Sequence, residues 1–208
     1  MRKDQQLYCL EEVINMRYKY TDKEMKKILD SLVILIDTRE QSNQHIIDFF
    51  NKKGINYKTM KLDFGDYSCM LPAGTIGKFT SDIYFDRDIA IERKNSIDEI
   101  AGNLKEDAAR LKKELAHMNM YQIRYLFFVE DPNFEENLRQ GNFRSQYDPF
   151  TLMQRLYKGI EAEYNTVIVP VDKKIIASKI YYTIQARVYN LFKHKGFILE
   201  EEGGELEN

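Results

Sequence analysis

Two carboxylates and a lysine have the types and the spacing of a site that holds a divalent metal ion beside a phosphate. The run of residues 88–94 begins with apolar side chains, as a buried strand does, and ends in Glu92, Arg93 and Lys94. Because strand side chains alternate, Glu92 and Lys94 share one face and Arg93 points the other way. A further acid, Asp66, follows a glycine and lies 26 positions before Glu92. The spacing predicts that the two acids bind a metal ion.

The chemistry expected of such a site is phosphodiester hydrolysis. Mg²⁺ prefers oxygen ligands and is usually held by one or two carboxylates, with water and substrate phosphate in its other positions. A bound ion would offset charge on the phosphate and favour ionisation of an attacking water. The ammonium group of Lys94 can orient that water or stabilise the phosphate. For Arg93 we expect an ion pair at the edge of the core or a contact across a turn.

Each of these residues also has a plainer interpretation. Most charged triplets are solvated surface, although this one directly follows an apolar strand and is followed by a helix cap. Asp98 lies in the first turn of the next helix, where the helix dipole alone favours an acid. Asp37 and Glu40 follow an apolar run at residues 33–36, where acids are often only turn or cap residues. The spacing alone leaves both interpretations open.

Hydrophobic periodicity predicts strands alternating with helices. Apolar runs indicate strands at 33–36, 55–62, 67–71, 125–129 and 166–169, and a hairpin of 82–85 with 88–93. Helical spacing indicates helices from Thr21, at 43–53, from Ser96 through Leu115, from Asp148, and from Asp172 to Gly196. The order predicts an α/β fold with a mixed central β-sheet flanked by helices.

Composition sets further bounds. The 208 residues fit one domain, and 31% of them are charged. No apolar run approaches 18 residues and the N-terminus has no apolar signal core, so we expect a cytoplasmic protein with no membrane association. Cys9 and Cys69 do not make a disulfide framework. The net charge of −2 does not itself indicate nucleic-acid binding, which depends on where the basic side chains lie.

Several motifs in the same order resemble a known family. Glu92, Arg93, Lys94 and Asp98 resemble the ERK-x-x-x-D signature of the XPF family of structure-specific endonucleases, and Gly65-Asp66 resembles the preceding GD of that family. The similarity spans roughly residues 32–190. It also includes the strand and D-x-R-E turn at 33–40, the helix carrying Gly102, Glu106, Arg110 and Leu111, and the strand at 125–130.

The resemblance implies a restriction-endonuclease-like core and Mg²⁺- or Mn²⁺-dependent cutting of branched or flapped DNA in repair, recombination or phage DNA processing. The roles that it implies are metal binding by Asp66, Glu92 and the Arg93 carbonyl; catalysis and DNA contact by Lys94; DNA contact by Arg110; and support from Asp37, Glu40 and Asp98.

We expect an N-terminal arm and helix at 1–31, an XPF-type nuclease domain at 32–196 and an acidic tail at 197–208. Residues 196–208 are too few for the helix-hairpin-helix pair of larger members, which leaves room for an additional DNA-targeting protein. The form resembles small stand-alone nucleases of bacteria and phages. The last helix is apolar on more than one stripe and rich in aromatic residues, which fits either a homodimer face or core packing.

Two other functions remain open. The first is a non-catalytic DNA-binding partner of a related nuclease, a class in which one or more of Asp66, Glu92 and Lys94 is typically lost. All three are present, which favours catalysis. The second is a protein-interaction module in which the charge cluster has no chemical role.

Overall fold

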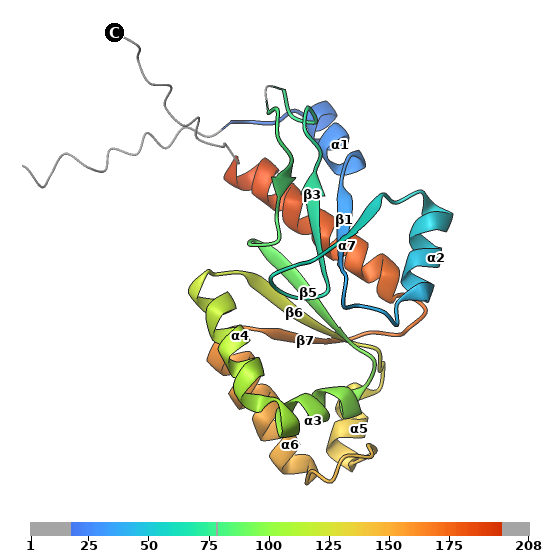
Figure 1. Cartoon of the computed structure of the whole chain (residues 1–208), viewed down its shortest axis with the longest axis vertical. Coiled ribbons are helices and arrows are strands. Elements are labelled where there is room, and N and C mark those ends of the chain that lie inside the picture. The colour runs from blue at the N-terminus through green and yellow to red at the C-terminus, as the bar shows by residue number, and fades with distance from the viewer. Residues whose placement is uncertain (1–17, 78, 197–208) are drawn as a thin grey trace, which may run out of the picture.

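A seven-stranded mixed β-sheet with helices on both sides forms the protein (Figure 1). The computed structural model describes residues 18–77 and 79–196. In chain order the elements are α1 (Asp22–Asp30), β1 (Val33–Asp37), α2 (Gln44–Lys53), β2 (Tyr57–Met60), β3 (Tyr67–Leu71), β4 (Ile83–Tyr84), β5 (Ile89–Lys94), α3 (Ile97–Glu106), α4 (Ala108–Met120), β6 (Arg124–Val129), α5 (Phe134–Gln140), α6 (Pro149–Leu156), the π-helical η1 (Tyr157–Ala162), β7 (Val167–Pro170), α7 (Ile176–Asn190) and the π-helical η2 (Leu191–Lys195).

The strand order is β2-β1-β3-β5-β6-β7. The β1–β2, β5–β6 and β6–β7 pairs are parallel, and β1–β3 and β3–β5 are antiparallel, which confirms the predicted mixed sheet. The predicted hairpin of 82–85 with 88–93 is wrong. Short β4 pairs with β3, where Met70 lies opposite Tyr84, and β5 also has β3 as its antiparallel neighbour. Residues near in sequence therefore pair with a common third strand.

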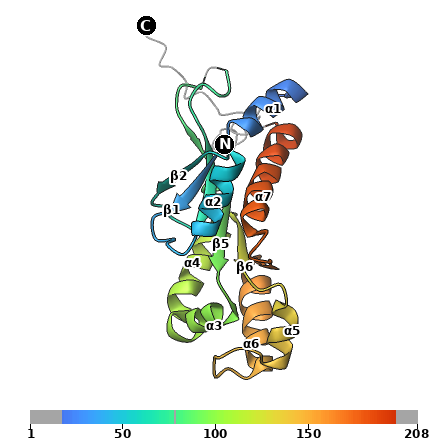
Figure 2. The ribbon, with the colours of Figure 1, turned by 90° about the vertical axis from the view of Figure 1, so that its right-hand side faces the viewer.

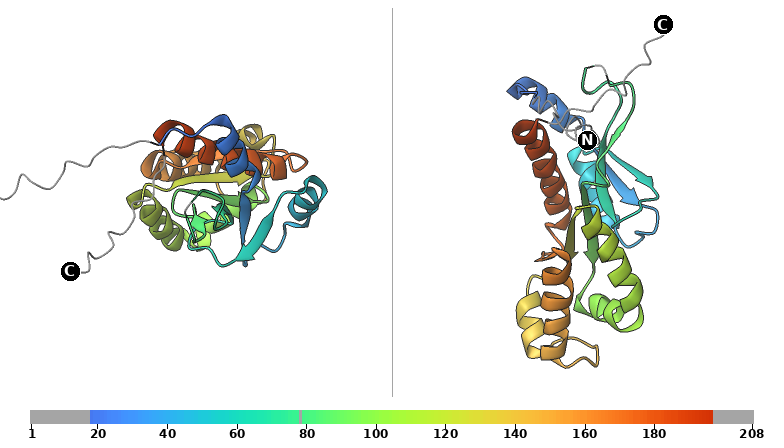
Figure 3. Two further views of the ribbon diagram at one scale, coloured as in Figure 1. Left: turned by 90° about the horizontal axis from the view of Figure 1, so that it is seen from above. Right: turned by 90° about the vertical axis from the view of Figure 1, so that its left-hand side faces the viewer.

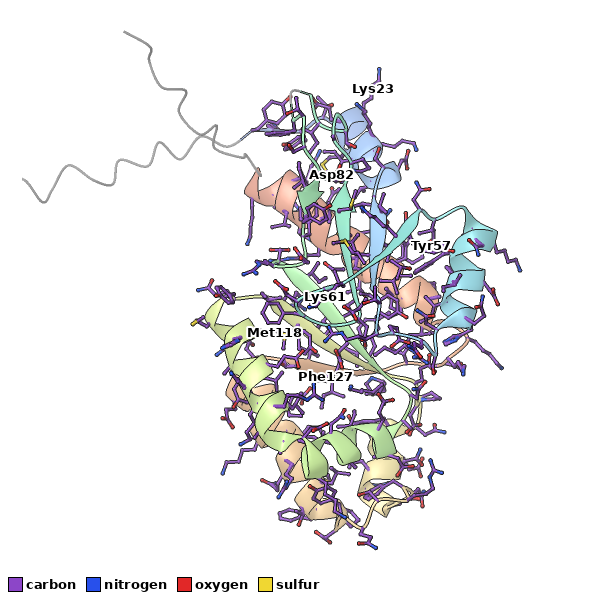
Figure 4. The ribbon with its side chains drawn as sticks, in the orientation of Figure 1. Lys23, Tyr57, Lys61, Asp82, Met118 and Phe127 are labelled. Atoms are coloured by element: carbon purple, nitrogen blue, oxygen red, sulfur yellow. The ribbon has the colours of Figure 1, made fainter. Side chains whose placement is uncertain are left out.

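The two larger of three hydrophobic cores in the described part of the chain lie on the sheet because β5 and β6 bury both faces, as their nearly unbroken apolar runs indicate. Ile91 and Phe128 belong to the core shared with α1, α2 and α7. Ala90 and Phe127 belong to the core shared with α3, α4, α5 and α6. Figures 2 and 3 show α7 on one side of the sheet and α3 and α4 on the other, and Figure 4 shows where Phe127 lies.

The segment after β5 forms two helices where the apolar spacing predicted one. α3 ends at Glu106 and α4 begins at Ala108, because Asp107 between them leaves helical geometry at φ −119° and ψ 19°. Figure 1 shows that the two helix axes point in different directions, so the break turns α4 back along the sheet. This turn decides which side chains of α4 reach the carboxylates at the end of β5.

The final helix also starts later than predicted. Asp172 does not cap α7, which begins at Ile176; its Oδ1 accepts a hydrogen bond from the Lys174 N–H within the preceding turn. The helical segment ends, as predicted, at Gly196 in the left-handed conformation. The predicted acidic tail and most of the predicted N-terminal arm lie outside the described residues. Within the described part of the chain, each helix is too short or too polar to cross a lipid bilayer.

Candidate active site

Asp66 is placed by a tight turn that enters β3. Gly65 adopts φ +66°, a conformation that favours glycine, and a Cβ atom there would lie 3.1 Å from the Ile91 carbonyl oxygen. The Asp66 N–H donates to that carbonyl at 2.9 Å, and the Asp37 N–H donates to the Asp66 carbonyl at 2.8 Å. The turn is therefore pinned between β1 and β5, which puts the Asp66 side chain beside the end of β5.

The two predicted metal-binding acids meet at this point. Asp66 Oδ2 accepts a hydrogen bond from the Arg93 N–H at 2.7 Å. Glu92 Oε1 accepts from Lys94 Nζ at 2.7 Å, so Glu92 and Lys94 do share one face of the strand. Burial, and then the charge of Glu92, raise the pKa of Asp66 well above the range usual for an aspartate. The two carboxyl groups are close enough for the charge of Glu92 to oppose ionisation of Asp66.

Tyr125 and Glu114 join this group although no sequence pattern assigned them a role in it. The Tyr125 hydroxyl donates to Glu92 Oε2 at 2.9 Å, from a position on β6 beside β5. Glu114, on α4, is half-buried; burial raises its pKa, and the charge of Glu92 raises it further. Sequence patterns assign Tyr125 to a buried strand and Glu114 to a helix, but they do not say which elements become neighbours.

Lys94 is a stable cation in this setting. Burial alone would lower its pKa, but the carboxylates of Glu92 and Glu99 outweigh burial, and the pKa lies above its ordinary value. Its Nζ lies 3.6 Å from Glu99 Oε1 as well as 2.7 Å from Glu92. The side chain stays protonated at neutral pH, so it can stabilise a negative phosphate but does not act as a base.

Arg93 points away from the carboxylates into a buried ion-pair network. Its side chain is 1% exposed, Nη1 lies 2.9 Å from Glu40 Oε1, and Nε lies 2.9 Å from Glu130 Oε1. His45 Nε2 lies 2.7 Å from the same Glu130 oxygen. This is the ion pair at the edge of the core that the alternation of strand side chains predicted. Glu130 was assigned no role from the sequence, although an acid directly after a buried strand is the same signal that Asp37 gives.

The network fixes the backbone that forms the site. Anchoring the Arg93 side chain on one face of β5 holds its N–H in place to bind Asp66 on the strand edge. Glu40 contacts Arg93, and its charge also raises the pKa of Asp66. Removing one partner of a buried ion pair leaves the other unpaired, which is strongly destabilising. Glu130 and Glu40 hold the side chain of Arg93 in this arrangement.

The other predicted acids have structural partners. Asp37 accepts hydrogen bonds from the N–H groups of Arg39 and Leu62, both at 2.7 Å; burial would raise its pKa, but these bonds lower it overall. Asp98 accepts from the Arg144 N–H at 2.7 Å and Arg144 Nε at 3.1 Å. Asp37 thus links the end of β1 to the segment at Leu62, and Asp98 links α3 to the segment at Arg144. The supporting role predicted for each acid stays a prediction.

Arg110, the predicted DNA contact, lies on the surface of α4. Its side chain is 65% exposed and pairs with Asp107 at 3.1 Å and Glu114 at 3.9 Å. Through Glu114 it lies next to the carboxylate group without touching Asp66 or Glu92. A phosphate contact by Arg110 therefore stays a prediction.

The mixed sheet and its flanking helices form a restriction-endonuclease-like α/β fold. The chain belongs to the ERCC4 domain family, whose model matches residues 36–192, and it is a nuclease domain of the XPF type. The predicted family and fold are thereby confirmed.

Solved structures with the same architecture include XPF from Aeropyrum pernix, at 16% identity and a TM-score of 0.54, covering 85% of this chain and 69% of that one. XPF from Aeropyrum pernix in complex with DNA aligns at 17% identity and a TM-score of 0.47, covering 75% and 64%. The pre-specific restriction endonuclease BsaWI–DNA complex aligns at 10% identity and a TM-score of 0.36, covering 83% and 62%. No curated protein sequence matches the chain.

Proposed function

We propose that this domain is a Mg²⁺- or Mn²⁺-dependent endonuclease that hydrolyses phosphodiester bonds in branched or flapped DNA. The observation that carries the proposal is that Asp66, in the turn before β3, lies close enough to Glu92 on β5 for the charge of Glu92 to raise its pKa, with Lys94 Nζ 2.7 Å from Glu92. Two close, partly buried carboxylates ionise together only at a cost, and a divalent cation between them removes that cost.

The available donors suit such an ion. Asp66 and Glu92 would hold it together with the backbone carbonyl of Arg93. In the described part of the chain no third His, Cys, Asp or Glu joins them in a metal-binding cluster. Two carboxylates are the number that Mg²⁺ commonly takes from a protein when substrate phosphate is also a ligand. When bound, the ion supplies charge neutralisation at the phosphate and lowers the pKa of water.

The other groups of the site would orient the two acids and stabilise charge on the phosphate. Lys94 remains cationic and would stabilise the charge that develops on the attacked phosphate. The Tyr125 hydroxyl holds one oxygen of Glu92, and burial keeps its pKa far above the ordinary value, so it stays a donor. The Arg93 N–H holds one oxygen of Asp66 and leaves the other for the ion. The site is thus built to hold its acids in one orientation.

Pairing of two copies through α7 is part of the proposal. Most apolar side chains of α7 are buried in the core of the same chain. Fewer apolar side chains are therefore left for a second, exposed stripe than the sequence suggested. Three side chains are exposed at intervals of seven residues: Ile175, directly before the helix, at 54%, and Tyr182 and Tyr189, within it, at 62% and 36%. Residues seven apart form a line along a helix, and tyrosine is common at protein interfaces.

Cleavage of a panel of labelled flaps, forks, four-way junctions and linear duplexes tests the proposal. We expect cutting with Mg²⁺ or Mn²⁺, no cutting in EDTA, and loss of cutting in Glu92→Gln. Asp30→Asn, which changes an exposed acid at the end of α1, should cut like the wild-type protein. DNA binding without cutting would instead support a non-catalytic partner of a nuclease, and absence of DNA binding would support a protein-interaction module.

A further inference from the structure

One face of α4 runs from the carboxylate group to an exposed aromatic side chain. Arg110, Glu114, His117 and Tyr121 follow at spacings of four, three and four, which places them along one side of the helix. Glu114 is close enough to Glu92 for their charges to interact. From Glu114 to the ring-bearing residue Tyr121 the helix rises about 10 Å, at about 1.5 Å per residue. This face of α4 therefore connects the carboxylate site with Tyr121.

Tyr121 is held at that point by residues of two other segments. Its ring centroid lies 6.5 Å from that of Phe64, two residues before Asp66. The Arg87 guanidinium carbon lies 5.4 Å from the Tyr121 centroid, and Arg87 Nη2 donates to Asp63 at 2.7 Å. The end of α4, the segment before β3 and the turn before β5 thus meet at Tyr121, a residue that remains 50% exposed.

The chemistry of this cluster suits an unpaired nucleobase. A half-exposed aromatic side chain with an Asp63-paired guanidinium group beside it offers an aromatic surface and hydrogen-bond donors together, and base–aromatic stacking tolerates any base. The exposed side chains of Lys61, labelled in Figure 4, and Arg124 add positive charge on flanking segments. In a continuous duplex each base is already stacked on its neighbours, so only a base outside the helix is free to lie on Tyr121.

We propose that Tyr121, with Arg87, is a stacking site for an unpaired base of the DNA strand that enters the carboxylate site. This rests on the proposed nuclease function and names one feature of its substrate. The rise of about 10 Å along α4 from Glu114 to Tyr121 is the length of a few nucleotides, so the stacked base would lie within a few nucleotides of the attacked phosphate. Tyr121 is then a specificity-determining residue for DNA with a short unpaired segment.

Binding without divalent metal tests this inference separately from cutting. Two probes are used: a duplex with three unpaired nucleotides, one of them the fluorescent base 2-aminopurine, and the same duplex fully paired. We expect Tyr121→Ala to weaken binding of the unpaired probe about tenfold and to abolish quenching of its fluorescence. Tyr121→Phe should match the wild-type protein. Tyr84→Ala, which removes a tyrosine 43% exposed on β4, should also leave binding unchanged.

The outcomes are distinct. Equal binding of the unpaired probe by Tyr121→Ala and wild-type protein, or an equal loss on both probes, would overturn the stacking site. If Tyr121→Ala fails to fold by circular dichroism, Tyr121→Leu keeps apolar packing on Phe64 without an aromatic face, and the same tenfold loss is expected. Stacking by a wild-type protein that cuts no DNA in Mg²⁺ would remove the proposed nuclease function and leave the stacking site standing.

Discussion

Asp66 is the residue whose charge conflicts most with its surroundings. Burial and the charge of Glu92 raise its pKa, so the folded state binds a proton more tightly than the unfolded chain does. Between the unfolded and folded pKa values, stability therefore falls as pH rises. We expect Asp66→Asn to abolish cutting and yet to raise Tm at pH 7, by about 2–4 °C for each kcal/mol of relief in a domain of this size. Thermal denaturation followed by circular dichroism measures the shift.

The pH dependence of this rise in Tm distinguishes an effect of the Asp66 charge from an effect of the change in side-chain shape. Near pH 4 the carboxyl group of Asp66 is protonated in the folded protein, so Asp66→Asn should then have the Tm of the wild-type protein. Asp30→Asn, at an exposed acid, should not stabilise at pH 7. A lower Tm for Asp66→Asn at pH 7 would mean that ionised Asp66 stabilises the fold, and the account of the carboxylate pair would be wrong.

Lys94 acts, in our proposal, on charge that appears only during reaction. Lys94→Ala should lower the turnover rate by about 10²-fold or more, with little change in the metal concentration needed for half-maximal activity. Lys94→Arg should restore little, because a planar guanidinium group does not replace a compact ammonium group between Glu92 and Glu99. Single-turnover cleavage across a metal titration measures both quantities. Unchanged turnover with weaker DNA binding would make Lys94 only a phosphate anchor.

At the scale of elements, the turn before β3 positions Asp66, and Gly65 makes that turn possible. Gly65 and Gly54 have nearly the same left-handed φ, +66° and +64°, but a Cβ atom would have open space at Gly54 and would meet the Ile91 carbonyl at Gly65. Gly54→Ala should cost about 1 kcal/mol from conformation alone. Gly65→Ala should cost about 1–3 kcal/mol more and lower cutting about 10²-fold, because displacing Asp66 disrupts the site.

Urea denaturation and cleavage rates of the two variants check this prediction. Gly102→Ala serves as a further control, since Gly102 lies in helix α3 with open space around it and alanine there should be neutral or stabilising. If Gly65→Ala and Gly54→Ala lost equal stability and both kept full cutting, the close approach of the turn to β5 would have no importance for the site.

Local patterns predicted what lies within an element, and they failed where distant elements meet. The apolar runs located β1, β3, β5 and β6, and strand alternation gave the opposite directions of Arg93 and Lys94. The spacing of Leu104, Ala108 and Leu111 is the same whether a helix continues or restarts, so the break at Asp107 left no trace in it. Tyr125 and Glu130 reach the site because β6 lies beside β5, and the sequence alone does not reveal that pairing.

At the scale of the whole molecule, α7 is the element that has both a buried and an exposed apolar side. Ile176, Ile180, Ile184 and Val188 are buried in the core with α1, α2 and the sheet, which accounts for most of the apolar character that the sequence showed. This leaves the line of Ile175, Tyr182 and Tyr189 as the exposed part. The ring centroid of Tyr182 lies 5.2 Å from that of its neighbour Tyr181, which adds a second aromatic ring beside the line.

We expect this line to join two copies into a homodimer, which would extend the DNA-binding surface and steepen the dependence of DNA affinity on salt. Light scattering at micromolar concentration should give a mass near twice 24.7 kDa. The double variant Tyr182→Glu and Tyr189→Glu should be monomeric, because it places two charges on each side of the interface. Tyr84→Glu on β4 should remain dimeric. A wild-type monomer with full cutting activity would show that the three exposed side chains are ordinary surface, and that a single domain supplies all the DNA contacts.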